Sequence, residues 1–209
     1  MPDPLGELYR LIGCDNLPLL YPAHDALTIM SQAPQIQNTT PLMQTRLFAV
    51  EAVELLFENG EARTFERLVG QGEGAVMVVP VLSPDRLLLI REYAVGVERY
   101  ELGFVKGRID SGESPEQAAR RELREEIGWD AHHLDKLETV ALTPAYSNYR
   151  THLFVARELF PAPLVGDEPE PLEVVEWPVS ALADLRKEPN FTDARSLLAT
   201  YLFEERAGL

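Results

Sequence analysis

The sequence predicts an α/β protein, in which helices cover both faces of a mixed β-sheet as an α/β/α sandwich and a small antiparallel hairpin element precedes the sheet. Three observations lead to this fold class. Apolar runs of strand length recur between residues 46 and 177. One highly charged helix, at residues 115–127, interrupts these runs. Further helical segments follow Pro178, so that helices are available for both faces of the sheet.

The first part of the chain is rich in proline and polar residues and has no long hydrophobic period. We therefore expect residues 1–42 to be a loosely ordered extension. Met30 is followed by Ser-Gln-Ala-Pro and resembles a start of its own, so residues 1–29 are interpreted as an accessory segment or a mis-assigned upstream extension. Residues 43–72 are predicted to form the hairpin element, and residues 73–209 the main domain.

The hairpin prediction rests on alternation and on one turn. Apolar residues alternate in a strand-like way over residues 46–57. Asn59-Gly60 is a strong signal for a two-residue hairpin turn. Residues 61–68 then form the returning strand.

The main sheet is predicted from apolar runs on both sides of the charged helix. Residues 74–82 and 86–93 are joined by a Ser-Pro-Asp turn and are apolar enough to be buried on two faces. A third run, at residues 100–105, leads to Gly107. The remaining predicted elements are strands at residues 137–142, 151–156 and 173–177, a proline-rich acidic loop at residues 159–172, and helices at residues 179–186 and 192–206.

The charged helix carries clear signals at both ends. Ser114 can accept a hydrogen bond as the N-cap, and Pro115 follows where its missing N–H has no cost. Gln117 stands three residues after Ser114, as in a capping box. Gly128 stands where a helix is commonly terminated by glycine.

Three glutamates share one side of this helix. At about 100° per residue, Glu122 and Glu126 lie one turn apart on one face, and Glu125 lies beside them. Like charges at this spacing repel one another, and a bound cation removes the repulsion. Carboxylate oxygens, water and substrate phosphates are the ligands that Mg²⁺ or Mn²⁺ takes. The alternative is a solvated surface helix, in which Arg121 and its neighbouring arginines pair with the glutamates.

Composition agrees with a soluble enzyme. The chain has 209 residues, 45% of them hydrophobic, and a net charge of −15, so a nucleic-acid backbone is not an expected partner. The single cysteine, Cys14, excludes an intramolecular disulfide and suits a reducing compartment. No apolar run approaches the ~18 residues of a membrane span, and no signal peptide is apparent. We expect a cytoplasmic protein without a membrane partner.

The string GRIDSGESPEQAARRELREEIGW, at residues 107–129, resembles the Nudix box, G-x5-E-x7-R-E-U-x-E-E-x-G-U with U apolar, at every fixed position. The resemblance implies the Nudix fold and the hydrolysis, with a divalent metal, of a nucleoside diphosphate linked to another group. It also implies roles for individual residues. The implied metal ligands are Glu122, Glu126, Glu125 and the backbone carbonyl of Lys106, and the implied supporting residues are Glu113 and Arg121.

The strings LLLIREYAVGVERYELGFVKG and GDEPEPLEVVEWP are similar to those of bacterial ADP compounds hydrolases of the NudE type, which are related to ADP-ribose pyrophosphatases. This resemblance covers residues 43–202. It implies cleavage of ADP-ribose, Ap3A and NADH, and a homodimer in which the N-terminal sheet helps to shape the partner's site. Two alternatives remain open: another nucleoside diphosphate derivative, such as a sugar nucleotide or a damaged nucleotide, and a non-catalytic nucleotide sensor.

The reaction needs a general base, and the resemblance to ADP-ribose pyrophosphatases implies a glutamate in the late acidic loop. Glu168 is preferred over Glu170, and a merely solvated loop is the alternative. Glu125 is a second candidate for a catalytic role. Arginines and aromatic residues outside the box are candidates for binding phosphate, ribose or adenine, although a core role is preferred for Phe48. These candidates are Arg67, Arg91, Arg99, Phe48 and Tyr146.

Overall fold

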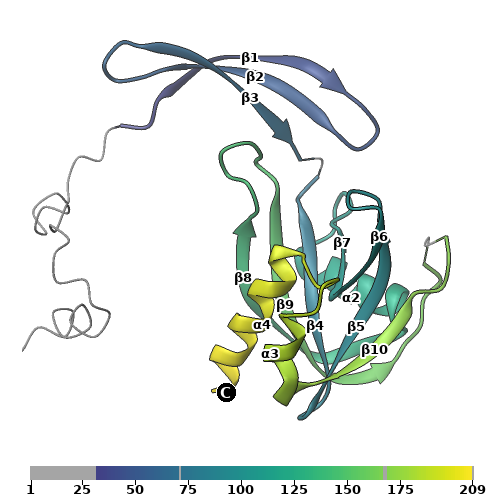
Figure 1. Ribbon diagram of the computed structural model, residues 1–209. Helices are drawn as coiled ribbons and strands as arrows, with labels where there is room; N and C mark the ends of the chain where they lie inside the picture. The colour runs from purple at the N-terminus through teal and green to yellow at the C-terminus, as the bar shows by residue number, and fades with distance from the viewer. Residues whose placement is uncertain (1–31, 71, 167–168, 209) are drawn as a thin grey trace, which may run out of the picture.

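The main domain of the computed structural model is built on a mixed, seven-stranded sheet (Figure 1). The structure describes residues 32–70, 72–166 and 169–208. The central strands follow the order β10-β5-β4-β9-β8, with β6 paired to β5 and β7 paired to β4. Only the pair of β4 and β9 is parallel among these strands. The strands are β4 (Ala75–Ser83), β5 (Arg86–Ala94), β6 (Arg99–Gly103), β7 (Val105–Arg108), β8 (Trp129–Ala141), β9 (Arg150–Pro161) and β10 (Glu173–Pro178).

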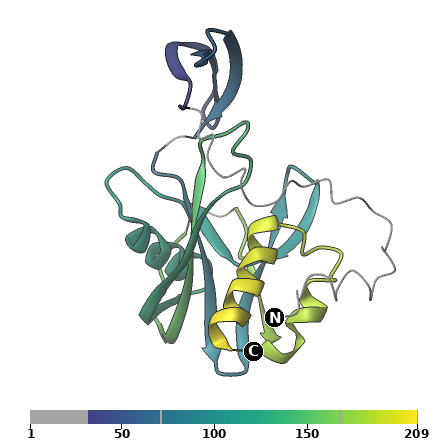
Figure 2. The same cartoon turned by 90° about the vertical axis from the view of Figure 1, so that its left-hand side faces the viewer.

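Helices cover both faces of this sheet (Figure 2), which confirms the predicted α/β/α sandwich. Alternate side chains of β4 enter separate cores, because successive residues of a strand point to opposite faces. Val76 and Val78 pack on the side of α2, while Met77 and Val79 pack on the side of α3 and α4. The helical elements are α2 (Pro115–Glu126), η1 (Val179–Ala181), α3 (Leu182–Leu185) and α4 (Ala194–Ala207). None of the described helices is long and apolar enough to cross a membrane.

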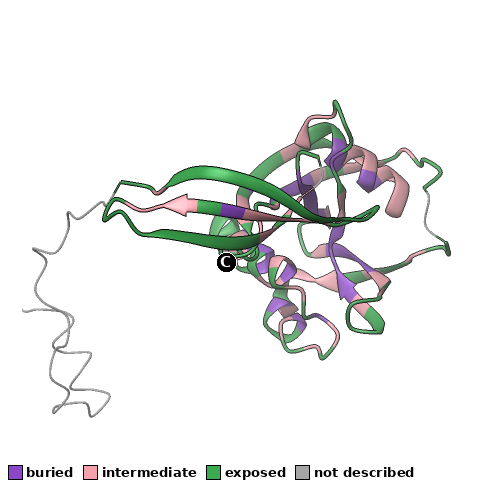
Figure 3. Ribbon diagram, turned by 90° about the horizontal axis from the view of Figure 1, so that it is seen from above, coloured by how far each residue is buried: buried purple, intermediate pink, exposed green. Residues whose placement is uncertain are grey.

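A separate antiparallel sheet stands away from the main domain (Figures 1 and 3). Its strands are β1 (Gln35–Gln44), β2 (Ala49–Leu56) and β3 (Ala62–Val69). The predicted hairpin of β2 and β3 is present, with Gly60 in a left-handed conformation at the turn.

The expectation of loose order is wrong for residues 35–42, because they form most of strand β1. This strand pairs with β2 along almost its whole length, from Gln35 opposite Leu56 to Gln44 opposite Ala49. Its side chains are all exposed, so it has no alternating hydrophobic pattern by which the sequence could reveal it. The hypothesis about residues 1–29 lies outside the described residues.

Two strand boundaries differ from the prediction. Strand β8 begins at Trp129, eight residues before the predicted start, because its first half is polar yet pairs with β9 up to Pro161. The run predicted at residues 100–105 is divided at Phe104. Its first part, β6, pairs with β5, and its second part, β7, pairs with β4.

Candidate active site

Helix α2 is fixed at its start by a reciprocal pair of hydrogen bonds. The backbone N–H of Gln117 donates to Ser114 Oγ at 3.2 Å, and the backbone N–H of Ser114 donates to Gln117 Oε1 at 2.8 Å. Ala118, Ala119 and Leu123 are fully buried against the sheet. The predicted capping box is therefore present, and the buried stripe packs the helix against the sheet with Glu122 buried alongside it.

A charged cavity of about 780 Å³ lies beside this helix and the end of β7. It brings together four of the residues that the sequence singled out: Glu122, Glu126, Lys106 and Arg121. Several residues that the sequence analysis did not propose also line it. These are Arg46, Leu47, Ala75, Glu92, Gly107, Arg108, Asp110, Tyr149 and Arg195.

Gly107 is required by the position of Glu122. A Cβ atom at residue 107 would overlap the carboxylate of Glu122, which lies directly against the glycine. Glu122 is itself buried, with 9% of the residue exposed. The first glycine of the box therefore leaves the space that this carboxylate fills.

Glu126 lies where a carboxylate is costly to ionise. Burial raises the pKa of Glu126 to about 9, and the negative charges of Glu122 and Glu92 add to the effect while Lys106 opposes it. Its Oε2 accepts a hydrogen bond of 3.3 Å from the backbone N–H of Lys106. A cation bound in this cavity would favour the ionised carboxylate.

Arg121 holds the acidic residues of the box together. Its guanidinium donates to both oxygens of Glu113, at 2.9 and 3.0 Å, to Glu122 Oε1 at 2.7 Å and to Glu125 Oε2 at 2.9 Å. It also donates to the backbone carbonyl of Arg108 at 2.8 Å. Hydrogen bonds from Arg121 hold the pKa of Glu113 below its usual range. Arg121 thus orients carboxylates, as expected of a supporting residue.

The donor set fits a hard divalent cation. Glu122 and Glu126 supply carboxylate oxygens on one wall of a single cavity, and such ligands are preferred by Mg²⁺ and Mn²⁺. Within the described residues, no three histidine, cysteine or acidic side chains are already gathered as a metal cage. Arg121 contacts both Glu122 and Glu125 and offsets part of their charge.

Glu92 is a functional candidate that the sequence analysis missed. It lies on β5 at a two-residue spacing from Leu88 and Ile90, both of which pack in the core on the side of α2. Glu92 therefore shares their face and reaches the cavity, where it pairs with Lys106. Extending the strand alternation from Ile90 to Glu92 would have revealed it.

Arg195 and Tyr149 are further missed residues, and no local pattern points to them. Arg195 comes from the first turn of α4, far from the box in sequence, and is held by Asp193 at 2.6 Å. Burial raises the pKa of Tyr149, while Arg195 and Arg108 lower it. Only the folded sheet brings these residues to the carboxylates of α2.

Several predicted residues lie away from the carboxylate cavity within one copy of the chain. Arg91 pairs with Glu173 at 2.9 Å, and Arg99 pairs with Glu101 at 2.5 Å. Glu170 accepts a hydrogen bond of 2.6 Å from the hydroxyl of Tyr100, which raises the pKa of Tyr100.

The preferred general base, Glu168, lies outside the described residues. The chain before it approaches the box helix, since a Cβ atom at Gly166 would lie 3.4 Å from the Cβ of Glu125. Glu125 itself contacts Arg121 and is half-buried.

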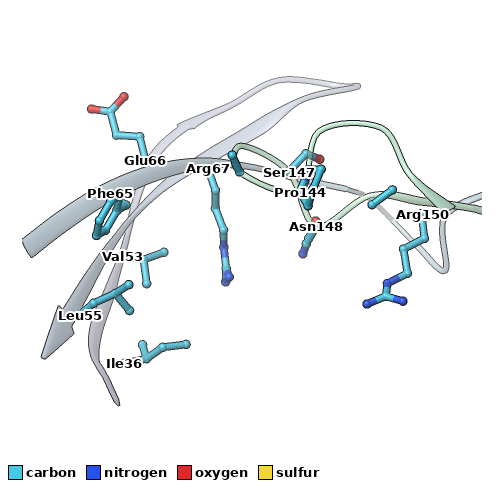
Figure 4. A pocket seen from close by; sticks show the side chains of 12 residues that line it. Ile36, Val53, Leu55, Phe65, Glu66, Arg67, Pro144, Ser147, Asn148 and Arg150 are labelled. Atoms are coloured by element: carbon cyan, nitrogen blue, oxygen red, sulfur yellow. The ribbon is translucent and has the colours of Figure 1, made fainter. Parts of the chain in front are cut away.

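Arg67 and Tyr146 lie where the N-terminal sheet meets the loop between β8 and β9. Arg67 pairs with Glu51 at 2.5 Å and lines a cavity of about 500 Å³ with Pro144 and Asn148 (Figure 4). The backbone N–H of Leu68 donates to the carbonyl of Tyr146 at 2.7 Å, and the ring of Tyr146 is exposed.

Phe48 lies nearer to the carboxylates. It lines a cavity of about 370 Å³ together with Leu47, Arg108 and Tyr149, which also line the carboxylate cavity. The residue is 58% exposed, so the preferred core role is wrong within one copy of the chain.

Comparison with known proteins places the chain in a family. The model of the NUDIX domain matches residues 73–201, and that of the NudE-type Nudix hydrolase N-terminal domain matches residues 34–67. The chain is 47% identical to the ADP compounds hydrolase NudE of Escherichia coli (strain K12), over 83% of this chain and 93% of the relative. It is 25% identical to the ADP-ribose pyrophosphatase of Bacillus subtilis (strain 168), over 80% and 94% of the two chains.

A solved structure agrees with this placement. The crystal structure of an ADP compounds hydrolase has a TM-score of 0.81 and 45% sequence identity to this chain, and the match covers 87% of this chain and 97% of the other. The glutamates and arginine of the box are all present in the matched region. The chain therefore belongs to the Nudix hydrolase family.

Proposed function

We propose that this protein hydrolyses the pyrophosphate bond of ADP-linked compounds such as ADP-ribose, Ap3A and NADH, and releases AMP or a similar mononucleotide. The observation that carries the proposal is the charged cavity in which Glu122 and Glu126 of the box face Lys106 and Arg121. The relatives named as an ADP compounds hydrolase and an ADP-ribose pyrophosphatase favour an ADP-linked substrate.

Glu122 and Glu126 would hold the metal, with Glu125 and the carbonyl of Lys106 as further ligands. Mg²⁺ or Mn²⁺ held by these residues would neutralise pyrophosphate charge and would lower the pKa of a water molecule. The chain's own residues prepare this site. Arg121 orients the carboxylates, and Lys106 holds Glu92 beside them.

The cationic lining of the cavity supports phosphate binding in a protein whose net charge is −15. Arg108, Arg195 and Arg46 line the same space as the carboxylates. Local guanidinium groups can bind phosphate oxygens where the overall field of an acidic protein repels them.

Glu168 remains our proposed general base, and Glu125 is the alternative. The approach of Gly166 to Glu125 supports a loop that reaches the box helix. A base must come within hydrogen-bond reach of the water that it activates. We therefore expect Glu168→Gln to lower kcat with little change in KM.

We also propose a cytoplasmic homodimer. The N-terminal sheet exposes large apolar side chains, among them Ile36 at 59% and Phe65 at 48%. Apolar surface of this kind is commonly covered by a partner. A second copy would cover this surface and would bring Arg67, Phe48 and Tyr146 toward the active site of its partner. Arg91 and Arg99 remain proposed substrate-binding residues on β5 and β6.

The test is a metal-dependent activity assay. Purified protein with Mg²⁺ is incubated with ADP-ribose, Ap3A, NADH, coenzyme A and dGTP, and the products are separated by chromatography. We expect AMP from the first three compounds and little product from the last two. Products from dGTP alone, or nucleotide binding without turnover, would replace the proposal by a damaged-nucleotide hydrolase or a sensor.

A matched pair of variants tests the metal ligands. Metal assistance contributes several kcal/mol, so Glu126→Gln should lower kcat/KM by about 10²–10³-fold. Glu116→Gln makes the same substitution at an exposed position of the same helix and should stay near the activity of the unaltered protein. Unchanged turnover and metal dependence in Glu126→Gln would refute the assignment.

A further inference from the structure

Three cavities adjoin one another along the end of the sheet. The carboxylate cavity shares Leu47, Arg108 and Tyr149 with the cavity beside Phe48. On another side, it shares Glu92, Lys106 and Arg195 with a cavity of about 570 Å³ between the β5–β6 hairpin and the start of α4. The charged centre is therefore flanked by a pocket on each side, and both volumes suit a ligand.

The cavity between the β5–β6 hairpin and α4, which we name the distal pocket, has a mainly apolar lining. Tyr93, Val95, Val97 and Leu142 contribute large side chains to it. These side chains are exposed, Val95 at 82% and Val97 at 52%. The ring of Tyr93 is supported edge-on by Tyr100, with 5.4 Å between ring centroids. The pocket thus offers an aromatic and aliphatic surface to a ligand.

The walls of the distal pocket are tied to each other. Glu101 accepts hydrogen bonds from the backbone N–H and the hydroxyl of Thr192, at 3.1 and 2.8 Å. The backbone N–H of Leu102 donates to the carbonyl of Asn190 at 2.7 Å. These bonds join β6 to the segment before α4, so the pocket is already formed without a ligand.

The polar side chains at the pocket wall have partners within the protein. The hydroxyl of Thr192 donates to Glu101, which also accepts from Arg99. Asp193 accepts from Arg195 through both of its oxygens. A sugar ring that leaves water needs several hydrogen bonds to replace those it made with water. A flat nitrogenous ring is instead stabilised by stacking on Tyr93 and by contact with the valines.

We propose that the distal pocket binds the ring of the second nucleoside, the one attached through phosphates to the ADP half of the substrate. The inference rests on the proposed function and adds to it a binding site for the second ring and a preference for substrates that carry two nitrogenous rings. The phosphates lie in the carboxylate cavity, where Arg195 faces both spaces. Substrates with two nitrogenous rings, such as Ap3A and NADH, place the second ring in the distal pocket. ADP-ribose has no second nitrogenous ring, so it leaves the stacking surface of the pocket uncovered.

The test compares substrates in the full-length protein. Loss of one aromatic stacking surface costs about 1–1.5 kcal/mol, so Tyr93→Ala should raise KM for Ap3A and NADH by about 10-fold. KM for ADP-ribose should change by less than about 2-fold. Tyr201→Ala removes a similarly exposed tyrosine on α4, outside the distal pocket, and should change neither.

A second variant distinguishes loss of the pocket surface from local unfolding caused by Tyr93→Ala. Leu142→Glu alters the pocket from the loop after β8, on a different wall, and should give the same order of effects as Tyr93→Ala. Inhibition provides an independent readout: both variants should weaken inhibition by nicotinamide mononucleotide about 10-fold and leave inhibition by ribose 5-phosphate unchanged.

The outcomes separate this inference from the proposed function. If the unaltered protein hydrolyses all three ADP compounds and the variants reduce activity on them equally, or not at all, the distal pocket does not bind the second ring. If the unaltered protein hydrolyses none of them, both proposals are overturned. A loss confined to Ap3A and NADH establishes the assignment.

Discussion

Glu126 carries a proton at neutral pH in the metal-free protein, because its pKa lies at about 9. Its pKa in the unfolded chain is close to the ordinary value of 4.5. The folded state therefore binds more protons between these values. The corresponding contribution to stability is complete below pH 4.5 and is lost as the pH rises toward 9.

Replacing Glu126 by glutamine should remove this dependence. In EDTA, the melting temperature of Glu126→Gln should exceed that of the unaltered protein near pH 9, and this difference should grow as the pH rises from 4.5 toward 9. The difference should disappear near pH 4.5. Thermal unfolding across this range, with Glu116→Gln as the control, measures it. A constant difference at every pH would contradict the raised pKa.

Metal binding should release a proton from the same carboxyl group. A ligand must be deprotonated before it binds a cation, so about one proton should leave per Mg²⁺ bound at pH 7.5. Calorimetric titrations in two buffers of different ionisation enthalpy give this number. A heat that is independent of the buffer would show that Glu126 is already ionised or is not a ligand.

Gly107→Ala tests the space beside Glu122. The added methyl group would displace the Glu122 carboxylate, which is the flexible end of a side chain. We therefore expect metal affinity to fall by about 10–100-fold with little loss of stability. Mn²⁺ binding followed by electron paramagnetic resonance measures this. Gly96→Ala, where a Cβ meets open space, should bind Mn²⁺ normally. Normal binding by Gly107→Ala would show that the site tolerates the shift.

The connection between the N-terminal sheet and the main domain is a short latch of hydrogen bonds. The backbone N–H of Gly70 donates to Asn148 Oδ1 at 2.8 Å, and Leu68 pairs with the loop between β8 and β9. Few contacts of this kind hold a sheet whose strands are largely exposed. The latch is therefore the element that fixes the sheet beside the active site.

Asn148→Ala should loosen this latch. We expect faster hydrogen exchange in residues 62–70, while the exchange of the main sheet stays unchanged, because loss of a few local contacts lowers local stability first. Hydrogen exchange read by mass spectrometry measures both regions. Asn59→Ala removes a similar hydrogen bond within the β2–β3 turn and serves as the control. Equal exchange in the latch region of both variants would contradict its role.

At the level of elements, the sequence predicted best where local signals agree. The box helix was predicted to within one residue because Ser114, Pro115, Gln117 and Gly128 specify both ends locally. Strand β1 was missed because its order comes from backbone pairing and its side chains stay exposed. Arg195 was missed because sheet topology, and no local pattern, brings α4 to the box.

The described part of the molecule consists of a main domain and a projecting sheet whose residues are largely exposed (Figure 3), among them the apolar residues Ile36 and Phe65. The box in the sequence predicts the carboxylates that line the charged cavity, whereas several candidate substrate contacts lie outside that cavity in a single chain. Arg67 and Phe48 illustrate this, since both lie on the N-terminal sheet or beside it, outside the carboxylate cavity.

The proposed dimer gives a prediction for the whole molecule. Phe65→Asp places a charge on the exposed apolar surface and should convert the dimer to a monomer. Sedimentation velocity measures the mass, and activity is measured at the same concentrations. Glu58→Gln, at the exposed end of the hairpin, should remain a dimer. An unaltered protein that sediments as a monomer at working concentrations would refute the proposal.

The division of one chain segment into β6 and β7 has a consequence for engineering. The fully buried Phe104 lies between Leu102 and Gly103, which line the distal pocket, and Lys106 and Gly107, which line the carboxylate cavity; Lys106 lines both. This short segment sets a fixed spacing along the chain. An insertion or deletion within it would therefore shift the distal pocket and the carboxylate cavity relative to each other. The turn at Val95 and Val97 lies outside this segment. Libraries that vary the length and side chains of this turn can therefore change substrate selectivity without disturbing the proposed metal ligands.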